Sequence, residues 1–340
     1  MRSTTRHMPL PAGSITKSLV SRDLAFVAAG FVALAIVMKM HWAIDFMIFC
    51  IFVLSYDLLY GYMGHLSFGH MLYFGAGAYG SAIWLAHVNA NPFLAIMAGL
   101  FAGALLSSFL GLIALQTHGA SFALINMAFN EIGFFLIHSA LSDYTYGEDG
   151  LSCTAGKLFG FINFYNERHS FIFVLVLLLL VFWLLRTLTV SPFGVLVRSI
   201  KEDENRVKFL GYNTMTYKWI TFVSASILAA LAGGMFTMIQ GFVSPITISP
   251  FGNVDVIFAV LIGGAGNLYG ALIGGVAFML IKNFLPVLIP ELEKLVPFQV
   301  PQWEMWLGIV LLVTVFALRK GLVGFVRQKW QHRRQVGVVS

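Results

Sequence analysis

Residues 170–187 read SFIFVLVLLLLVFWLLRT, an apolar run in which the only charged residue is Arg186. An α-helix rises about 1.5 Å per residue, so about 20 apolar residues are needed to cross about 30 Å of hydrocarbon. This run therefore predicts a membrane-spanning helix. The rest of the chain decides whether it is a single anchor or one span of many.

The composition of the whole chain indicates many spans. Hydrophobic residues make up 59% and charged residues 11% of the 340 residues, against about 45–50% and about 25% in soluble domains. One globular core could not bury so much apolar surface, and disorder requires low hydropathy. Two cysteines, Cys50 and Cys153, are too few for a disulfide framework. We expect an all-α polytopic membrane protein.

Ten segments are candidate spans. They are residues 22–40, 42–60, 66–87, 92–116, 119–141, 170–187, 218–240, 253–266, 268–285 and 303–319. The eighth and ninth are short and interrupted by glycine. The prediction is therefore about ten transmembrane helices, or eight if two short segments are re-entrant.

Lys and Arg residues lie mainly on one side of these spans. Sixteen precede the first span, lie in or beside the loop after the sixth, or follow the last, and five lie on or near the other side. Cytoplasmic loops collect Lys and Arg, so both termini are predicted inside and the number of spans is even. The predicted parts are a cytoplasmic tail (1–23), a transmembrane domain (24–319) with an inner loop (188–217) and an outer loop (142–169), and a basic cytoplasmic tail (320–340).

Two glycine-dense patches, at residues 61–80 and 263–275, interrupt the apolar sequence. Gly266, Gly270 and Gly274 have the four-residue spacing of a small-residue ridge, which lets membrane helices pack closely. Broken helices also form transporter binding sites, because unwound backbone is tolerated only against protein or a watery cavity. Tight packing explains any single glycine, whereas two patches favour a transport architecture.

Motifs for enzymatic chemistry are missing. A G-x-G-x-x-G pattern at Gly75, Gly77 and Gly80 lies inside an apolar span with no preceding strand, so it does not predict a dinucleotide site. Leu151 stands where a P-loop ending at Gly156-Lys157 would need glycine, and no zinc-protease spacing occurs. We expect no catalytic residue, no metal ligand, no cofactor and no nucleic-acid partner.

The inner loop, residues 191–212, reads SPFGVLVRSIKEDENRVKFLGY. Proline and glycine end the preceding helix, and Gly211 ends the charged segment. Between them we expect a short charged helix with an apolar stripe formed by Val197, Ile200, Val207 and Leu210. Such a helix can lie on lipid, insert into a groove of a partner, or stay solvated. The acidic triplet 202–204 would be repelled by anionic lipid, which favours the protein partner.

Four acids lie within or at the edges of spans. Asp45 and Asp255 lie near outer ends and Asp57 near an inner end, whereas Glu131 lies deeper. A charge at the bilayer centre costs about 2.5–3.5 kcal/mol on insertion scales, so Glu131 should face protein or a pathway. Asn126 and Asn130, one turn apart, add polar groups to the same helix. A pathway role and a structural hydrogen-bonded role both remain open for Glu131.

The inner loop resembles the cytoplasmic coupling region of ABC importer permeases of the branched-chain amino-acid type, the LivH/LivM family, and the resemblance is LivM-like. The family pattern is approximately G-R-x-x-R-A-I-R-E-[ND]-E-x-[RA]-A-x-x-L-G, in which Lys201 replaces an Arg, Ser199 an Ala and Val195 the first Arg. The resemblance assigns ATPase coupling to Gly194, Arg198, Ile200, Lys201, Glu202, Asp203, Glu204, Leu210 and Gly211.

Further segments resemble family motifs in the same order. They are residues 58–70, 147–151, 224–234 and 263–270, with Asp57 where Asn is common and Tyr146 where Gly is common. The residues predicted to line the translocation pathway are Asn126, Asn130, Glu131, Asp57, Gly264 and Gly266.

The resemblance implies an all-helical permease of the type II-like importer architecture, in the bacterial inner membrane. Its partners would be a second permease, two cytoplasmic ATPases that bind ATP and Mg, and an extracytoplasmic solute-binding protein. The solute would be a branched-chain amino acid, with urea, other amides and aromatic acids as alternatives. An ion-coupled secondary transporter is the second reading and would need a coupled acid at the midplane and no docking helix. A polytopic enzyme is the third.

Overall fold

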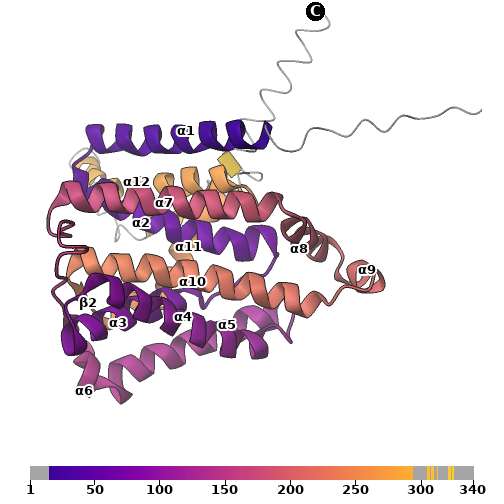
Figure 1. Ribbon diagram of the computed structural model, residues 1–340, viewed down its shortest axis with the longest axis horizontal. Coiled ribbons are helices and arrows are strands. Elements are labelled where there is room, and N and C mark those ends of the chain that lie inside the picture. Colours follow the sequence, from indigo (N-terminus) through magenta and orange to yellow (C-terminus); the bar gives the residue numbers. More distant parts are fainter. Residues whose placement is uncertain are drawn as a thin grey trace, which may run out of the picture.

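The computed structural model describes residues 15–293 and, beyond them, residues 305, 306, 308, 309, 312, 321, 322 and 324. Most of these residues form helices that run roughly along the long axis of the molecule (Figure 1). Helices α8 and α9 lie at one end, which we call the α8 end. The short strands β1 and β2 lie at the other, which we call the β1 end.

The elements follow one another with short connections. They are α1 (Ile15–Val37), α2 (Met40–Asp57), η1 (Leu58–Tyr62), α3 (His70–Ile83), η2 (Trp84–Val88), α4 (Pro92–Ala114), α5 (Ala120–Phe135), η3 (Leu136–Ala140), α6 (Ser142–Thr145), η4 (Gly147–Asp149), β1 (Leu151–Ser152), α7 (Glu167–Val190), α8 (Pro192–Glu202), α9 (Glu204–Phe209), α10 (Thr214–Gln240), β2 (Phe242–Val243), η5 (Pro245–Ile248), α11 (Phe251–Gly263) and α12 (Leu268–Glu293).

Every predicted span from 22–40 to 268–285 overlaps a helix of the structure. Within the described residues, six helices are long and apolar enough to cross a membrane, so the chain is a multi-pass membrane protein and the count of about ten spans is not confirmed. Helix α1 begins at Ile15, inside the segment expected as a tail. The tail before Ile15, most of the predicted span 303–319 and most of the basic tail 320–340 lie outside the described residues.

Helices α2 and α10 form the centre of the bundle. The side chains of α2 from Ala43 to Asp57 are almost all buried, and those of α10 are buried along most of its length. Helices α1, α4 and α5 lie outside them and expose large apolar side chains such as Phe26, Phe101 and Phe135. An apolar outer surface is expected where a protein faces lipid hydrocarbon.

Glycines bring neighbouring helices into backbone contact. A Cβ at Gly77 of α3 would overlap the carbonyl group of Ala230 in α10. In the same way, a Cβ at Gly263 of α11 would overlap the carbonyl of Gly270 in α12. Both glycine-dense patches therefore pack helices closely, as the small-residue spacing predicts.

Two short helices begin inside the bundle rather than at its ends. Helix α3 starts at His70, whose Nε2 lies 3.0 Å from Ser55 Oγ in α2, and Ser55 precedes the end of η1 by seven residues, about 10 Å of helix. Helix α11 starts nearby, because its Asn253 Oδ1 accepts a hydrogen bond of 2.8 Å from the backbone N–H of Met71. Segments 63–69 and 241–250, which contain no α-helix, lead to these two starts.

The two predicted loops contain regular structure. Segment 142–169 contains α6, η4 and β1, and β1 pairs antiparallel with β2 through Leu151↔Val243 and Ser152↔Phe242. Segment 188–217 contains α8 and α9. The first segment lies at the β1 end and the second at the α8 end, so the two predicted loops lie at opposite ends of the bundle (Figure 1).

Candidate functional site

A sharp turn joins α7 to α8 at the α8 end. The Ser191 hydroxyl accepts a hydrogen bond from Gly194 N–H at 3.4 Å, and Pro192 occupies the first turn of the helix. A Cβ at Gly194 would lie 2.5 Å from the carbonyl oxygen of Leu188. Glycine at this position therefore lets α8 fold back directly after α7.

The expected single charged helix is two helices, α8 and α9, separated at Asp203. The backbone of Asp203 is extended (φ −157°, ψ 95°), and its carboxylate accepts a hydrogen bond of 3.0 Å from Arg206 N–H at the start of α9. Gly211 has φ +87° and ends this region before α10. An N-cap aspartate explains the break, because its side chain replaces a missing intrahelical acceptor.

The apolar stripe of this region faces the chain itself. Val197, Ile200 and Val207 are buried, whereas Leu210, predicted to belong to the stripe, is 71% exposed. Its neighbour Phe209 is 91% exposed and was not among the predicted site residues. The helical spacing of Phe209 differs from that of the stripe, so periodicity alone could have indicated that it points away from the core.

Helix α8 is attached through cationic side chains to η1, which directly follows α2. Lys201 Nζ donates a hydrogen bond of 2.7 Å to the carbonyl oxygen of Gly61 in η1. The guanidinium carbon of Arg198 lies 4.7 Å from the centre of the Tyr62 ring, also in η1, which is cation–π geometry. A displacement of α8 would therefore pull directly on η1.

The end of α2 is attached in turn to the turn between α11 and α12. Buried Asp57 accepts a hydrogen bond of 2.7 Å from the backbone N–H of Gly266. Gly264 and Gly266 have φ of +104° and +81°, so this turn requires glycine. The sequence motifs predicted Asp57 and Gly266 as pathway residues and Lys201 as a coupling residue, and the structure brings all three into one chain of contacts.

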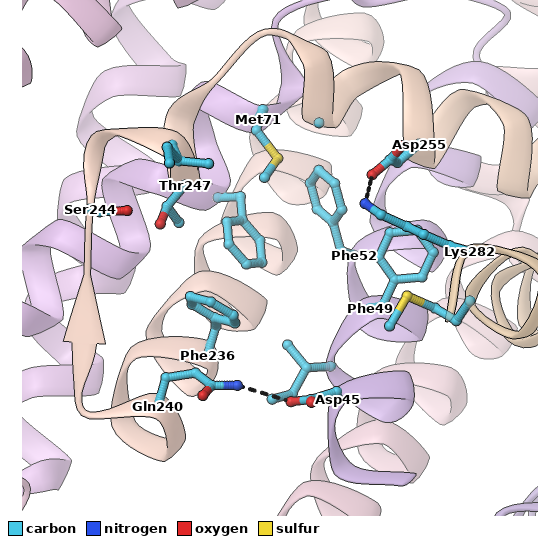
Figure 2. Close-up of a pocket in the computed structure, with 15 residues that line it drawn as sticks. Asp45, Phe49, Phe52, Met71, Phe236, Gln240, Ser244, Thr247, Asp255 and Lys282 are labelled. Atoms are coloured by element: carbon cyan, nitrogen blue, oxygen red, sulfur yellow. Dashed lines mark hydrogen bonds and ion pairs between the residues drawn. The ribbon is translucent and has the colours of Figure 1, made fainter. Parts of the chain in front are cut away.

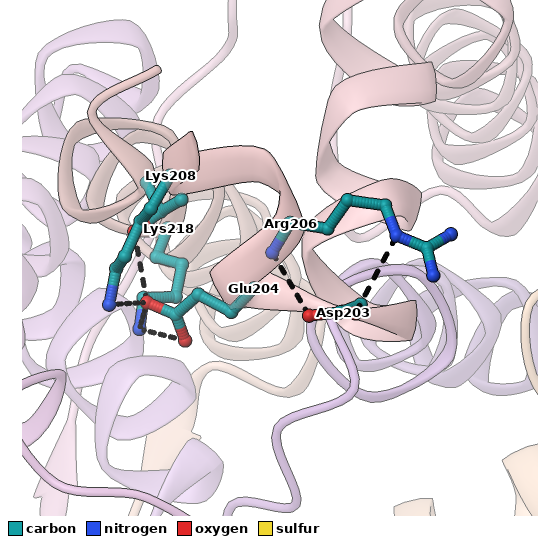
Figure 3. A network of polar contacts seen from close by, with 6 residues as sticks. Asp203, Glu204, Arg206, Lys208 and Lys218 are labelled. Atoms are coloured by element: carbon teal, nitrogen blue, oxygen red, sulfur yellow. Dashed lines mark hydrogen bonds and ion pairs between the residues drawn. The ribbon is translucent and has the colours of Figure 1, made fainter. Parts of the chain in front are cut away.

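Glu204 is held by a network within the chain (Figure 3). Its carboxylate lies 3.0 Å from both Lys208 Nζ and Lys218 Nζ and accepts a 2.9 Å hydrogen bond from Thr214 Oγ1. Lys218 is only 2% exposed. Burial raises the pKa of Glu204, but the hydrogen bonds from Lys208, Lys218 and Thr214 outweigh it and lower this pKa to about 2. The acidic triplet therefore does not act as one surface, because Glu204 fastens α9 to α10.

The other charged groups of the loop remain at the surface. Glu202 is exposed, and Asp203 pairs with Arg206 at 3.7 Å beside the capping bond (Figure 3). The apolar side chains of Phe209 and Leu210 are exposed at the same end of the molecule. We call this set the α8-end surface, with the residues Glu202, Asp203, Phe209 and Leu210.

The predicted pathway residues of α5 lie on two faces of that helix. Asn130 is buried and donates a 2.7 Å hydrogen bond to the carbonyl oxygen of Ile248, while its side-chain oxygen accepts a 3.2 Å bond from Asn253. Asn126 is also buried and donates to Phe122 O of its own helix at 2.8 Å. Glu131 is exposed on another face. Asn130 therefore links α5 to the segment before α11 and to α11 itself, Asn126 bonds within its own helix, and Glu131 is separate from both.

Residues 38–318 match the family described as branched-chain amino acid transport system / permease component. The high-affinity branched-chain amino acid transport system permease protein LivM of Escherichia coli K12 is 27% identical over 264 residues, which cover 70% of this chain and 61% of that protein. The probable branched-chain amino acid transport permease protein LivM of Methanocaldococcus jannaschii is 26% identical over 326 residues, which cover 82% of this chain and 91% of that protein. The permease protein LivH of Escherichia coli K12 is 24% identical over 249 residues, which cover 67% of this chain and 78% of that protein.

The chain therefore spans about 61% of the length of the Escherichia coli LivM protein that it matches. No solved structure matches it. The family match nevertheless covers most of the 340 residues, including the α8 end and the glycine turn at Gly266. This chain belongs to the family of branched-chain amino acid transport system permease components.

Proposed function

We propose that this chain is the membrane-spanning permease subunit of an ATP-driven ABC importer. The solute is a small amphipathic molecule, with branched-chain amino acids as the first candidates because the relatives are named for them. One observation carries the proposal: α8 is joined to η1 by Lys201 and Gly61, and α2 is joined to the α11–α12 turn by Asp57 and Gly266. A surface helix with this attachment can pass movement into the bundle.

In this proposal ATP and Mg bind to two partner ATPase subunits, and this chain is not an enzyme. Closure of the ATPases would displace α8, and the Lys201–Gly61 bond would carry the displacement into η1. From η1 it would reach the α11–α12 turn, whose glycines permit a change of backbone angles that other residues resist. Chemical energy is thus converted into a rearrangement of the helices, with no cofactor bound by this chain.

The α8-end surface is the proposed docking site for an ATPase. Phe209 and Leu210 are the apolar residues of that surface and are 91% and 71% exposed, and the exposed charges near them in the chain have both signs, from Glu202 and Asp203 and from Arg206 and Lys208. An apolar centre with a charged rim is typical of protein interfaces. The groove of the ATPase would then offer an apolar pocket with charged groups at its edge.

The exposed face of α5 is the proposed contact with a second permease subunit or with the pathway between the two. Glu131 lies on this face, and apolar Leu124, Ile132 and Phe135 are also exposed there. A carboxylate near the middle of a membrane helix is too costly to leave against lipid, so its face needs protein or water. A partner permease satisfies this requirement.

We also propose ten crossings with both termini in the cytoplasm of a bacterium, the membrane being the inner membrane. Residues 63–69 with α3, and residues 241–250 with α11, each complete one crossing with a partly irregular path. The α8 end is then cytoplasmic and carries the loop 188–217, and the β1 end receives solute from an extracytoplasmic binding protein. Residues 1–23 and 320–340 would be the cytoplasmic tails of the transmembrane domain 24–319.

Reconstituted transport tests the proposal. The chain with its partner permease, both ATPases and binding protein should take up radiolabelled leucine into liposomes only with ATP, and an ATPase variant that cannot hydrolyse ATP should abolish uptake. The chain alone should transport nothing under a proton or sodium gradient. Gradient-driven uptake by the chain alone would instead indicate a secondary transporter.

Docking is tested separately with Phe209→Asp. Because Phe209 is 91% exposed, this change should leave folding intact but reduce capture of the ATPase at least about tenfold, as expected for an apolar anchor at an interface. The matched control is Phe161→Asp, since Phe161 is 69% exposed in the loop before α7, toward the β1 end. Normal capture by the Phe209→Asp protein would remove the α8-end surface from the interface.

A further inference from the structure

A cavity of about 420 Å³ lies between α2, α3, α10, α11, α12 and the segment that precedes α11 (Figure 2). Its mouth lies at the β1 end, because Gln240, the exposed last residue of α10, contributes to its lining. Its inner part reaches Met71 and Gly252, at the starts of the two short helices. Irregular backbone inside a membrane protein is tolerated where it lines such a cavity.

One wall of the cavity is aromatic. Phe49 and Phe52 come from α2, Phe74 from α3 and Phe236 from α10. The Phe52 and Phe74 rings meet edge to face with centroids 5.1 Å apart, and the Phe74 and Phe236 centroids lie 5.8 Å apart. These rings, with the thioether of Met71, form a surface suited to an alkyl side chain.

Charged side chains of both signs complete the lining. Lys282 of α12 pairs with Asp255 of α11, and on another side Asp45 of α2 accepts a 3.2 Å hydrogen bond from Gln240 (Figure 2). His41 Nε2 also lies 3.6 Å from the Asp45 carboxylate. Asp45, Phe49 and Phe52 have the i, i+4, i+7 spacing of one helix face, so the aromatic wall continues inward from the Asp45 carboxylate.

These groups select for one kind of solute. The ammonium group of Lys282 can receive a carboxylate, and Asp45, which has no cation other than a nearby histidine among the described residues, can receive an ammonium group. An apolar solute would add no partner for Lys282 beyond Asp255 or for Asp45 beyond Gln240 and His41, and a simple anion would meet two carboxylates for one ammonium group. A free amino acid with an apolar side chain supplies both charges and an alkyl group, and the volume lies within the range of small-ligand pockets, about 300–1,000 Å³.

We infer that this cavity binds a zwitterionic amino acid with an apolar side chain, its carboxylate at Lys282, its ammonium group at Asp45 and its side chain against Phe52, Phe74 and Phe236. The inference rests on the proposed function for the direction from which the solute arrives, the β1 end. It adds a solute site inside a single permease chain, apart from the α5 face and from the Asp57–Gly266 contact.

Equilibrium binding of radiolabelled leucine to the purified full-length chain in nanodiscs tests the site without any ATPase. Lys282→Gln and Asp45→Asn should each weaken binding about tenfold or more, because each removes a charge-assisted hydrogen bond. Lys157→Gln and Asp143→Asn are matched controls, since both side chains are exposed in segment 142–169. Absence of binding to the wild type at millimolar leucine, or equal binding by pocket and control variants, would overturn the inference.

Ligand analogues identify which charge meets which residue. Leucinol lacks the carboxylate, so it should bind the wild type about tenfold more weakly than leucine, and Lys282→Gln should weaken leucinol binding little further. In the same way, 4-methylpentanoate lacks the ammonium group, so it should bind the wild type more weakly than leucine, and Asp45→Asn should weaken its binding little further. Such non-additivity is the signature of a direct contact, and additive losses would contradict the assigned orientation.

A thiol at the pocket provides a test that does not depend on removing a charge. Cys50 and Cys153 are both buried, so in a Ser244→Cys chain the introduced thiol should be the main reactive group, and leucine should slow its labelling. Ser244→Trp should fill the cavity and abolish binding, whereas Ser244→Ala should retain it. If leucine does not slow labelling, and the Ser244→Trp chain still binds leucine, the assignment of the solute to this cavity is wrong. If leucine binds but the assembled importer does not transport it with ATP, the proposed function fails and the site stands.

Discussion

Single residues at the α8 end have roles that their charge alone does not reveal. The sequence suggested that acids 202–204 act together toward a partner, but Glu204 faces Lys218 of α10 and only Glu202 and Asp203 remain at the surface. The side chain of Lys218 is 2% exposed, so it depends on Glu204 for compensation of its charge. Nothing local in the sequence links residues 204 and 218, since that contact depends on how α9 folds back onto α10.

Replacing Glu204 with Gln should therefore destabilise the chain rather than weaken docking alone. Breaking a buried ion pair by removing one partner costs about 3 kcal/mol or more, and the Glu204 carboxylate is only 22% exposed. Thermal unfolding in detergent should show a midpoint several degrees lower. Glu202→Gln is the matched control and should change stability by less than about 0.5 kcal/mol.

Adding Lys218→Met to Glu204→Gln should recover at least half of the loss, because no buried charge then lacks a partner. A double variant no more stable than Glu204→Gln would mean that the ion pair is not the cause. Equal midpoints for Glu202→Gln and Glu204→Gln would mean that the network contributes nothing.

The stability contributed by Glu204 should disappear in acid. Its pKa is lowered from an ordinary value of about 4.5 to about 2 in the folded chain. A lowered folded-state pKa gives stability that is fully present above the unfolded pKa and is lost as pH falls through the folded pKa. The difference in unfolding midpoint between the wild type and Glu204→Gln should therefore be constant from pH 7 to about 5 and shrink between about 4.5 and 2. A constant difference down to about pH 3 would contradict it.

At the scale of elements, hydrophobic runs in the sequence predicted where the helices lie along the chain. They did not predict that two of these helices begin inside the bundle rather than at its ends. Each predicted span between residues 22 and 285 overlaps a helix, because a run of about 20 apolar residues has few alternatives in a bilayer. The starts of α3 and α11 inside the bundle depend on Asn130, Asn253 and Met71, which come from distant parts of the chain. Such contacts leave no periodic pattern, so the cavity beside them could not be predicted.

The glycine in η1 provides a test at this scale. A Cβ at Gly61 would overlap both the Asp57 carboxylate and the backbone nitrogen of Gly266. Gly61→Ala should therefore separate η1 from the α11–α12 turn, lower stability by about 1–3 kcal/mol as overpacking does, and reduce ATP-driven uptake more than ATPase capture. Thermal unfolding, capture and uptake measured on one preparation would separate these effects.

Gly30→Ala is the matched control, because nothing lies within 4 Å of a Cβ at Gly30 in α1. It should be neutral or slightly stabilising, since alanine favours helix over glycine by about 0.5–1 kcal/mol. If Gly61→Ala behaves like Gly30→Ala in all three measurements, close contact between η1 and the glycine turn is not required for coupling.

At the scale of the whole molecule, the charge distribution and the cavity give the bundle a direction. The loop 188–217 is rich in Lys and Arg and lies at the α8 end, and the cavity lined by Asp45 and Gln240 opens at the opposite end. Basic loops stay on the cytoplasmic side, so the α8 end should face the ATPases and the cavity should face the incoming solute. A single orientation in the membrane therefore agrees with the distribution of Lys and Arg, with the proposed docking surface and with the proposed solute site.

Cysteine labelling in intact cells tests this orientation and the number of crossings. Asn205→Cys and His118→Cys should react with a membrane-impermeant reagent only after the membrane is opened, whereas Glu148→Cys, at a side chain 84% exposed, and Asn89→Cys should react directly. Background labelling should be low because Cys50 and Cys153 are buried. Asn89 follows η2, so direct labelling there shows that residues 63–88 complete one crossing, whereas the alternative of eight crossings concerns residues 253–285. Direct labelling at position 205 would reverse the orientation and remove the α8 end from reach of any cytoplasmic ATPase.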